Sequence, residues 1–371
     1  MKLRTLRTIE LFYLCIFALP STGIFLCGQT TATGYSPPLG GIELSAGAFR
    51  ETPVGIPFHR TAVIIADLVE IAAPLVDDND NFLSLRLLLD RSIGSAGDYD
   101  PDPDTGLPSY YLEVVTGSAA GERFPIAGSG EDWLIIEQKP QGTLVANFDP
   151  NEARDRVRIR PCWTPNTLMP VENAPLSAQS ESSTPIETRD NDAILLPGAQ
   201  SGTQHVVQRF NTSTDDSYNW AEWNGDDNPE VANDYGVSPG KVGWIRSANS
   251  ADIKWVVTGD VTIFEATWAI PLPSSGDVLE WSFSLTEPKA VTLDSSGLKS
   301  VLRSSTSAAE RTDELVVWDD LTGFHSRPAK RFYLQSASPD PIWREVGDES
   351  IDQGTYTLEP GKAYTINRRK E

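Results

Sequence analysis

The sequence predicts an all-β protein of sandwich-like domains, with an internal repeat of about 120 residues and a truncated second copy. The composition favours strands and turns, because Gly, Pro and Trp are frequent and Met is rare. No long stretch has the apolar period of a helix. Four short patterns occur twice, in the same order, in the C-terminal half of the chain.

Residues 1–28 have the composition of a secretory signal peptide. Lys2, Arg4 and Arg7 precede an apolar run at 11–19. That run is too short to cross a bilayer, for which about 20 residues are needed. We therefore expect cleavage after Gly28, export to the periplasm, the cell surface or the medium, and no membrane span in the mature chain.

The charge of the chain restricts its partners. With 30 Lys and Arg against 52 Asp and Glu, the formal net charge is -22. Nucleic acid would be repelled, so the expected partners are extracellular glycans or proteins. Signal cleavage would remove Cys15 and Cys27 and leave Cys162, so no disulfide is expected within the mature chain. Cys162 lies beside a Trp, and we interpret it as a buried apolar residue.

An N-terminal β domain is predicted at 29–168. Its strand-like segments alternate with Gly-rich turns, as in "YYLEVVTGSAAGERFPIAGSGEDWLIIEQ". The segment "VRIR" at 157–160 alternates apolar and basic residues, as in a strand with one face in a core. Residues 169–188 have no period and are rich in Ser, Pro, Glu and Thr, which predicts a linker.

The repeat is the most informative feature of the chain. "RDNDAILL" at 189–196 returns as "ERTDELVV" at 310–317, and "VSPGKVGWIRS" at 237–247 returns as "LEPGKAYTINRR" at 358–369. Between these patterns, "QRF" ending at Phe210 matches "KRF" ending at Phe332, and "NWAEW" ending at Trp223 matches "IWREV" near Trp343. We therefore predict repeat unit 1 at 189–303 and truncated unit 2 at 304–371. His205 and His325 fall near equivalent places in the two units.

The Pro-Gly-Lys segment of each unit is interpreted as a turn. Pro followed by Gly is typical of a type II turn, because Pro presets φ and Gly accepts a positive φ. A phosphate-binding loop would need more glycines and a following helix, and the pattern here continues as a strand.

The chain resembles a family of uncharacterised exported β-repeat proteins found chiefly in verrucomicrobial bacteria. The features that carry the resemblance are "TPVGIPFHR", "YYLEVVTGSAAGERFPI", "VRIRPCWT" and the doubled pattern of strands described above. The resemblance covers most of the mature chain. It implies export and a repeat architecture, and it implies no particular activity, substrate or cofactor.

One acidic loop is a candidate calcium site. In "GDYDPDPDTG", Asp98, Asp100, Asp102 and Asp104 recur at every second residue, and carboxylates so spaced can converge on Ca²⁺. The interleaved prolines favour an extended, solvated loop instead, and the Gly and Glu of an EF-hand loop are missing. The segment "VDDNDN" at 76–81 has the same two interpretations.

Two tryptophans are candidate ligand-binding residues. Trp220 and Trp223 flank Glu222 in "NWAEW" and could stack on sugar rings, although periodic aromatic residues are more often core. No zinc-binding histidine spacing, nucleophile elbow or nucleotide-binding loop is present. We predict a non-enzymatic structural or adhesive protein with glycan as one class of ligand. The alternative is a polysaccharide-acting enzyme that uses paired carboxylates, with Glu222 as a candidate.

Overall fold

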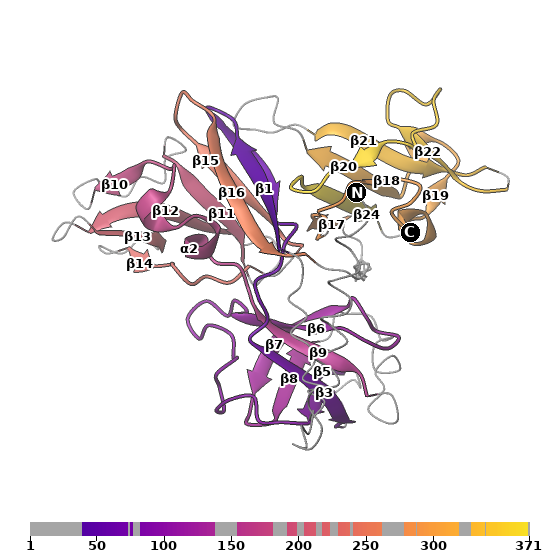
Figure 1. The fold of residues 1–371 in the computed structure, drawn as a ribbon. Coiled ribbons are helices and arrows are strands. Elements are labelled where there is room, and N and C mark those ends of the chain that lie inside the picture. Colours follow the sequence, from indigo (N-terminus) through magenta and orange to yellow (C-terminus); the bar gives the residue numbers. More distant parts are fainter. Residues whose placement is uncertain are drawn as a thin grey trace, which may run out of the picture. The chain divides into compact units, whose positions relative to one another are not determined.

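The computed structural model describes residues 39–72, 75–76, 82–137, 154–180, 191–198, 204–212, 217–222, 229–237, 240–261, 278–286, 288–318, 328–337 and 339–369. The predicted signal peptide and residues 77–81 of the second acidic segment lie outside these ranges. The described chain is nearly all β, arranged in several sheets (Figure 1), which confirms the predicted all-β class. Three apolar clusters form separate cores.

One core lies inside a closed antiparallel barrel. Each of its six strands pairs with two neighbours, and the pairing of the third strand of the chain with the fifth closes the circle. The strands are β3 (Ile64–Ile71), β5 (Phe82–Leu89), β6 (Tyr110–Val114), β7 (Arg123–Ser129), β8 (Trp133–Glu137) and β9 (Arg156–Pro161), with β4 (Leu75–Val76) paired to β5. Val157 and Ile159 are fully buried in this core, as the alternation in "VRIR" predicts. Closure leaves the barrel without free edges along these strands.

A second core lies under the sheet that we call the first sheet. Its strand order is β14-β13-β12-β11-β15-β2, and β10 pairs in parallel with the second half of β12. The bounds are β2 (Arg50–Gly55), β10 (Ala178–Ser180), β11 (Ala193–Pro197), β12 (Gln204–Thr212), β13 (Ser217–Glu222), β14 (Glu230–Val231) and β15 (Val242–Ser247). A two-stranded ribbon of β1 (Leu39–Ala46) and β16 (Ile253–Asp260) and the short helix α2 (Pro165–Leu168) complete this core.

The third core belongs to the second sheet, whose order is β17-β24-β20-β21-β22, with β19 parallel to β21. The bounds are β17 (Val278–Phe283), β19 (Ser304–Ser305), β20 (Asp313–Trp318), β21 (Pro328–Gln335), β22 (Ile342–Glu345) and β24 (Tyr364–Arg369). Beside it, β18 (Val291–Thr292) pairs with β23 (Thr357–Leu358). Short 3₁₀ turns occur at Val171–Asn173, Leu298–Ser300 and Ala308–Glu310.

The five strands of the first sheet from β13 to β2 have the same order as the five of the second sheet from β22 to β17, and their registers match. Ala193 of β11 pairs with Arg246 of β15, and the residues 121 positions later, Glu314 and Asn367, pair with each other in β20 and β24. The parallel strands β10 and β19 take the same place beside β12 and β21. The bridge between Trp163 and Val237 likewise corresponds to the pairing of Val291 with Leu358.

Two sequence matches are shifted in register. Ile194 pairs with Val207, and its counterpart Leu315 pairs with Phe332, so Phe332 corresponds to Val207 rather than to Phe210. By the same reasoning, Lys330 corresponds to His205, because they pair with Val317 and Leu196 respectively. His325, the sequence match of His205, lies outside the described residues.

The strand pairing also differs from the predicted domain boundaries. Strands β1 and β2 precede the barrel in the chain, yet they pair with β16 and β15 instead of joining a domain at 29–168. Strand β17, predicted in unit 1, pairs with β24, so the second sheet is not truncated. The predicted linker at 169–188 contributes Met169, Val171 and Leu176 to the core of the first sheet, because their apolar side chains pack under it. Residues 181–188 are not described.

The first sheet is interrupted in the chain by the barrel. Its strand β2 ends at Gly55, and the chain returns to this part of the fold at Trp163 after the six barrel strands. In the second sheet, only a short connection separates β17 from Val291. The barrel therefore lies in the first sheet at the chain position where the second sheet has a short loop. Because of this insertion, a search for sequence repeats does not detect that β2 belongs to the first sheet.

The two sheets contact each other through equivalent backbone atoms. The Gly55 N–H donates to the Gly361 carbonyl at 3.0 Å, and the Ser284 N–H donates to the Gly240 carbonyl at 2.9 Å. Val54 and Phe283 occupy equivalent positions, because they pair with Gly243 and Tyr364. Ser284 therefore corresponds to Gly55, since each is the next residue in the chain. Gly240 and Gly361 both have positive φ, 76° and 81°, as the turn interpretation predicts. The contact is thus reciprocal, as in a two-fold symmetric interface.

Candidate functional site

The four aspartates of the candidate calcium loop do not converge. Asp104 is exposed, and the other three side chains accept hydrogen bonds within the loop or from Ser129. In the described part of the chain, no three His, Cys, Asp or Glu side chains are placed to hold a metal ion. The hydrogen bonds join Asp98 to the Ser95 amide (2.7 Å), Asp100 to the Ser129 hydroxyl (3.0 Å) and Asp102 to the Thr105 amide and hydroxyl (2.8 Å each).

Trp220 is a core residue, which corrects its interpretation as a sugar-stacking residue. Its side chain is fully buried, and its Nε1 donates to the Met169 carbonyl at 3.0 Å. Because both faces of the ring are covered, no sugar can stack on it. Trp343 of the second sheet is also fully buried and is its counterpart. Trp223 lies outside the described residues.

Glu222 lies in a polar cluster near the edge of the first sheet, which we call the Glu222 cluster. His205 on β12 and Glu222 at the end of β13 lie on neighbouring strands, and His205 Nδ1 is 2.8 Å from Glu222 Oε2. The Val206 N–H donates to Glu222 Oε1 at 3.2 Å. Glu230 of β14 pairs directly opposite Glu222. Glu230 is exposed and the His205 side chain is 20% exposed, so solvent reaches the cluster.

Tyr235 forms the floor of the Glu222 cluster. Its ring meets the His205 ring edge-on, with centroids 5.2 Å apart. Burial, and then the charges of Glu222 and Glu230, raise the pKa of the Tyr235 hydroxyl far above its usual value. The hydroxyl is buried, and a hydrogen bond with Glu222 is a further cause of its raised pKa. The phenol is therefore neutral and lies beside Glu222.

The second sheet has the same arrangement around Glu345, with a lysine in place of the histidine. Lys330 Nζ lies 2.9 Å from Glu345 Oε2 and 5.4 Å from the centroid of the Tyr356 ring. Tyr356 follows Tyr235 by 121 residues, the spacing that relates the central strands of the two sheets. The same geometry thus occurs twice, once with a titratable base and once with a permanent cation.

A second polar cluster, the Arg160 cluster, joins the barrel to the ribbon strand β16. Arg160 Nε donates to Glu113 at 2.7 Å, and its Nη1 donates to Asp260 at 2.8 Å. All three side chains are at most 2% exposed. Sequence alternation places Arg160 on the polar face of its strand, but that face is covered rather than solvated. Such a closed network stabilises a contact and offers no opening to a substrate.

His59 and Tyr111 extend the Arg160 cluster. His59 Nδ1 lies 2.6 Å from the Tyr111 hydroxyl, and both side chains are buried. Burial, together with the charges of Arg123 and Arg160, lowers the pKa of His59 well below its ordinary 6.5. Burial also raises the pKa of Tyr111 well above its usual range, so a neutral imidazole and a neutral phenol share this hydrogen bond. Cys162 follows Arg160 by two residues and is also buried, in agreement with its interpretation as a buried apolar residue.

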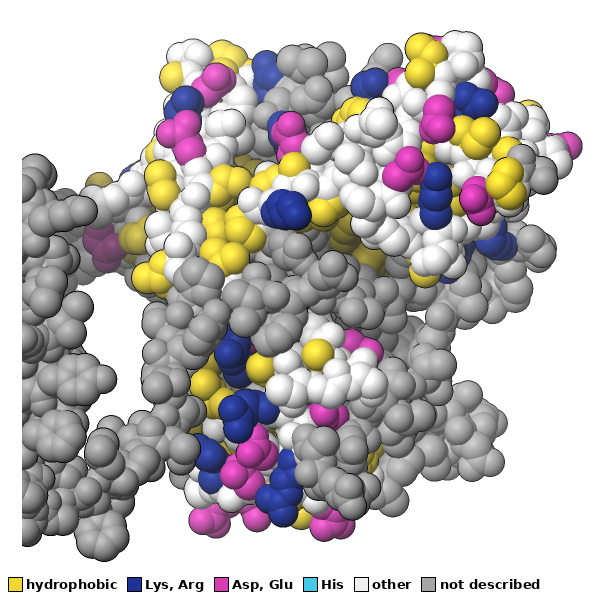
Figure 2. Space-filling view, turned by 45° about the vertical axis from the view of Figure 1, so that its right-hand side comes forward, with side chains coloured by type: hydrophobic (Ala, Val, Ile, Leu, Met, Phe, Trp, Pro, Cys, Tyr) yellow, Lys and Arg dark blue, Asp and Glu magenta, His cyan; other side chains and the backbone are white. Residues whose placement is uncertain are grey.

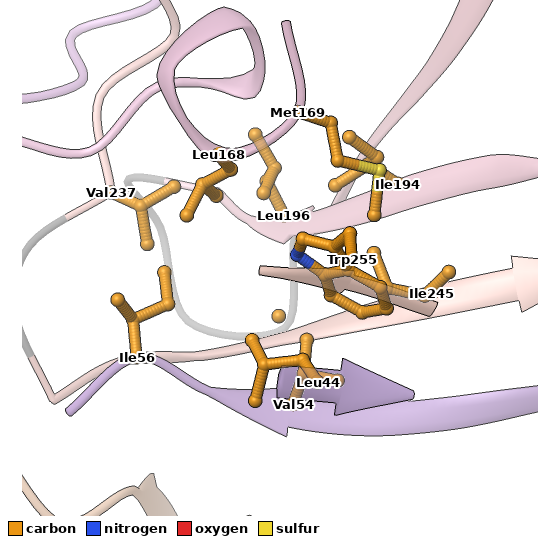
Figure 3. A pocket seen from close by; sticks show the side chains of 11 residues that line it. Leu44, Val54, Ile56, Leu168, Met169, Ile194, Leu196, Val237, Ile245 and Trp255 are labelled. Carbon is orange, nitrogen blue, oxygen red and sulfur yellow. The ribbon is translucent and has the colours of Figure 1, made fainter. Parts of the chain in front are cut away.

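A small apolar cavity lies in the core of the first sheet (Figure 3). Its volume is about 20 Å³, room for roughly one water, and its lining is almost wholly apolar. Trp255 lines it, and the indole nitrogen lies on the side of the ring that faces Leu168 and Leu196. Gly243, also in the lining, corresponds to Tyr364 of the second sheet, because they pair with Val54 and Phe283. The second sheet thus has a tyrosine at the register position where the lining of this cavity has a glycine.

One face of the molecule carries charges of both signs. On the face in Figure 2, acidic and basic side chains are interspersed. Among the residues that the structure places, none of the helices has the length and apolar character that a membrane crossing requires.

Comparisons of the chain with protein-family models, with curated proteins and with solved structures find no match. The candidate site is therefore defined by geometry alone. Sequence reasoning identified Glu222 and missed its partners, although the spacing of 121 residues between Tyr235 and Tyr356 was a usable signal.

Proposed function

We propose that this chain is an exported, non-enzymatic structural or adhesive protein that binds glycan at the Glu222 cluster. The observation that supports this function is the set of polar groups gathered near the edge of the first sheet: a carboxylate held by His205, a second carboxylate opposite it, and the ring of Tyr235 against His205. Sugar hydroxyl groups bind to such directed polar groups on a rigid support. The net charge of -22 is compatible with a neutral or cationic glycan.

Two further proposals accompany this function. We propose that the two sheets are copies of one duplicated unit, because their strand order and registers agree and their Glu-centred clusters are alike. We also propose that the chain is related to the exported β-repeat proteins that its sequence resembles. Export is supported by the N-terminal sequence, and N-terminal sequencing of the exported protein should begin at Gln29 if cleavage follows Gly28.

Binding is favoured over catalysis by the state of Glu222. Both of its oxygens accept hydrogen bonds, from His205 and from the Val206 N–H. A catalytic nucleophile needs an oxygen directed at the substrate, and a general acid needs a proton to give. Glu222 is instead held in place as an oriented acceptor.

One observation favours the alternative, a polysaccharide-acting enzyme. Glu222 and Glu230 lie opposite each other on neighbouring strands. Glycosidases of both stereochemical classes use two facing carboxylates. This pair would be the catalytic pair if the chain hydrolyses glycans.

One experiment separates the two functions. The mature protein is incubated with a panel of insoluble and soluble polysaccharides, and co-sedimentation and reducing-end release are both measured. We expect retention on at least one glycan and no release. Reducing-end release that is lost in Glu222→Gln would instead establish the enzyme, and neither retention nor release on any glycan would refute glycan binding.

A further inference from the structure

We propose that the junction between the barrel and the first sheet is an acid-sensitive latch, which opens when His59 takes up a proton. We call this junction the barrel neck. It consists of residues 58–61, which lead from β2 into the barrel, and residues 160–163, which lead out of it. The barrel would then be joined to the first sheet by a closed neck at neutral pH and by an open neck at acid pH.

Hydrogen bonds hold the two chain crossings of the barrel neck to each other and to β16. Arg60 Nη1 donates to the Cys162 carbonyl at 3.1 Å, from one crossing to the other. The backbones of His59 and Asp260 exchange two hydrogen bonds, of 3.0 and 2.7 Å. The barrel and the first sheet have separate apolar cores. The neck can therefore open locally while both cores stay packed.

His59 cannot become charged in the closed neck without a loss of free energy. Its side chain is 0% exposed, and its Nδ1 shares a hydrogen bond with the Tyr111 hydroxyl. Its Nε2 is buried and has no hydrogen-bond partner among the described residues. A protonated imidazole has two N–H donors. Even if Nδ1 donates to Tyr111, the Nε2 proton would be buried without an acceptor, and the charge would be removed from water.

The charges around His59 also oppose its protonation. Arg123, Arg158 and Arg160 each act on the imidazole and, after burial, lower its pKa. The carboxylates of the neck are already bonded to Arg160, which donates to Glu113 at 2.7 Å and to Asp260 at 2.8 Å. Water would relieve this repulsion once the neck opened. The charged and titratable groups beside His59 are Arg60, Tyr111 and Glu113 of β6, Arg123 of β7, Arg158 and Arg160 of β9, Cys162, and Asp260 of β16.

The pH at which the neck opens follows from the two states of His59. In the open neck, water surrounds the imidazole and its pKa is near the ordinary 6.5, whereas the closed neck holds that pKa well below 6.5. Above pH 6.5 the imidazole is neutral in both states, so the closed neck is favoured. Below pH 6.5 the open state binds one more proton, and the ratio of open to closed molecules rises by up to about tenfold per pH unit. Carboxylates titrate near pH 4 and stay largely ionised down to pH 5.

Cys162 can report the opening, because it is 0% exposed in the neck and is the only cysteine in the chain from Gln29. Its rate of labelling by dithiodipyridine is measured between pH 7.5 and 5. Each rate is divided by that of the urea-unfolded chain at the same pH, which removes the pH dependence of the thiol and the reagent. We expect the normalised rate to rise about thirtyfold from pH 7.5 to 5 with unchanged circular dichroism.

A matched pair of variants assigns the effect to one histidine. His59→Gln keeps a hydrogen-bonding side chain that cannot be charged and should abolish the rise. His205→Gln makes the same change at a histidine of the Glu222 cluster, outside the neck, and should retain the rise. A rate that is constant from pH 7.5 to 5 in the unaltered protein, or a rise that persists in His59→Gln, would overturn the latch.

Hydrogen exchange of the unaltered protein provides a second measurement that does not depend on the folding of a variant. After correction for intrinsic exchange, the amides of His59 and Asp260 should lose protection by the same factor between pH 7.5 and 5. The Val114 amide, which donates to the Glu122 carbonyl within the barrel at 3.0 Å, should keep its protection. Parallel loss of protection at Val114 and His59 would indicate unfolding of the barrel and would also overturn the latch.

Discussion

The two sheets share a backbone plan, but they neutralise their buried charges in different ways. In the second sheet, the buried Asp313 is paired with Arg303 and Arg368, and Glu345 is paired with Lys330. In the first sheet, the corresponding Asp192 accepts, among the described residues, from two backbone N–H groups and the Asn249 amide, and Glu222 faces His205. Register is set by the apolar pattern and the turns, so charged partners can change without moving a strand. The second sheet is neutralised by its own side chains, whereas the first has a carboxylate pair beside a titratable base.

The largest expected effect tests the equivalence of the two cores. Trp220→Ala and Trp343→Ala should each lower the free energy of unfolding by about 3–5 kcal/mol, because each ring is fully buried at corresponding positions. Urea denaturation of both variants measures this. A loss confined to one of the two would contradict the equivalence.

The buried aspartates should differ. Asp313→Ala should cost about 3–5 kcal/mol, since it leaves the buried guanidinium of Arg368 without its carboxylate. Asp192→Ala leaves neutral donors without an acceptor and should cost about 1–3 kcal/mol. The same denaturation assay compares them, and an Asp192 loss equal to or above that of Asp313 would show that charge does not distinguish the sheets.

The turn glycines provide a smaller, matched comparison. Gly240→Ala and Gly361→Ala place a Cβ at positive φ and should each cost about 1–2 kcal/mol. At Gly361 the added Cβ would also lie 2.9 Å from a methyl group of Leu44. Melting temperatures of both variants test these losses, and a neutral Gly361→Ala would refute the strain at positive φ.

The smallest effect concerns the barrel that is inserted in the first sheet. The unfolded chain protonates His59 near pH 6.5, whereas the folded chain holds its pKa well below that value. Its contribution to stability is therefore complete above pH 6.5 and is lost as the pH falls below 6.5, by at most about 1.4 kcal/mol per pH unit. Unfolding free energies between pH 7.5 and 5 should fall less steeply in His59→Gln. Identical slopes would mean that His59 is not buried in the neutral form.

The all-β fold and the turns were predictable from local patterns. The alternation around Val157 and the Pro-Gly pairs report backbone geometry directly. The domain boundaries were not predictable from local patterns. Strand β2 pairs with β15, which follows the inserted barrel, and β17 pairs with β24, which is distant in sequence. The match of Phe210 to Phe332 failed for a related reason: register depends on which residues fill the core, and Val207 fills the place of Phe332.

The candidate site was only partly predictable. Glu222 is conspicuous between two tryptophans, but periodicity cannot tell that Trp220 points into the core. The cluster depends on the pairing of β12, β13 and β14, which brings His205 and Glu230 to Glu222 from opposite sides in sequence. Only the internal comparison with Lys330 indicates what chemistry the site accommodates.

The central claim is that the two sheets share a backbone plan and differ in how they neutralise their buried charges. The most direct measurement is the free energy of unfolding of the His205→Lys variant, which places beside Glu222 the cation that lies beside Glu345 in the second sheet. We predict that the variant keeps the fold and is at least as stable as the unaltered protein. A loss of stability would contradict the claim.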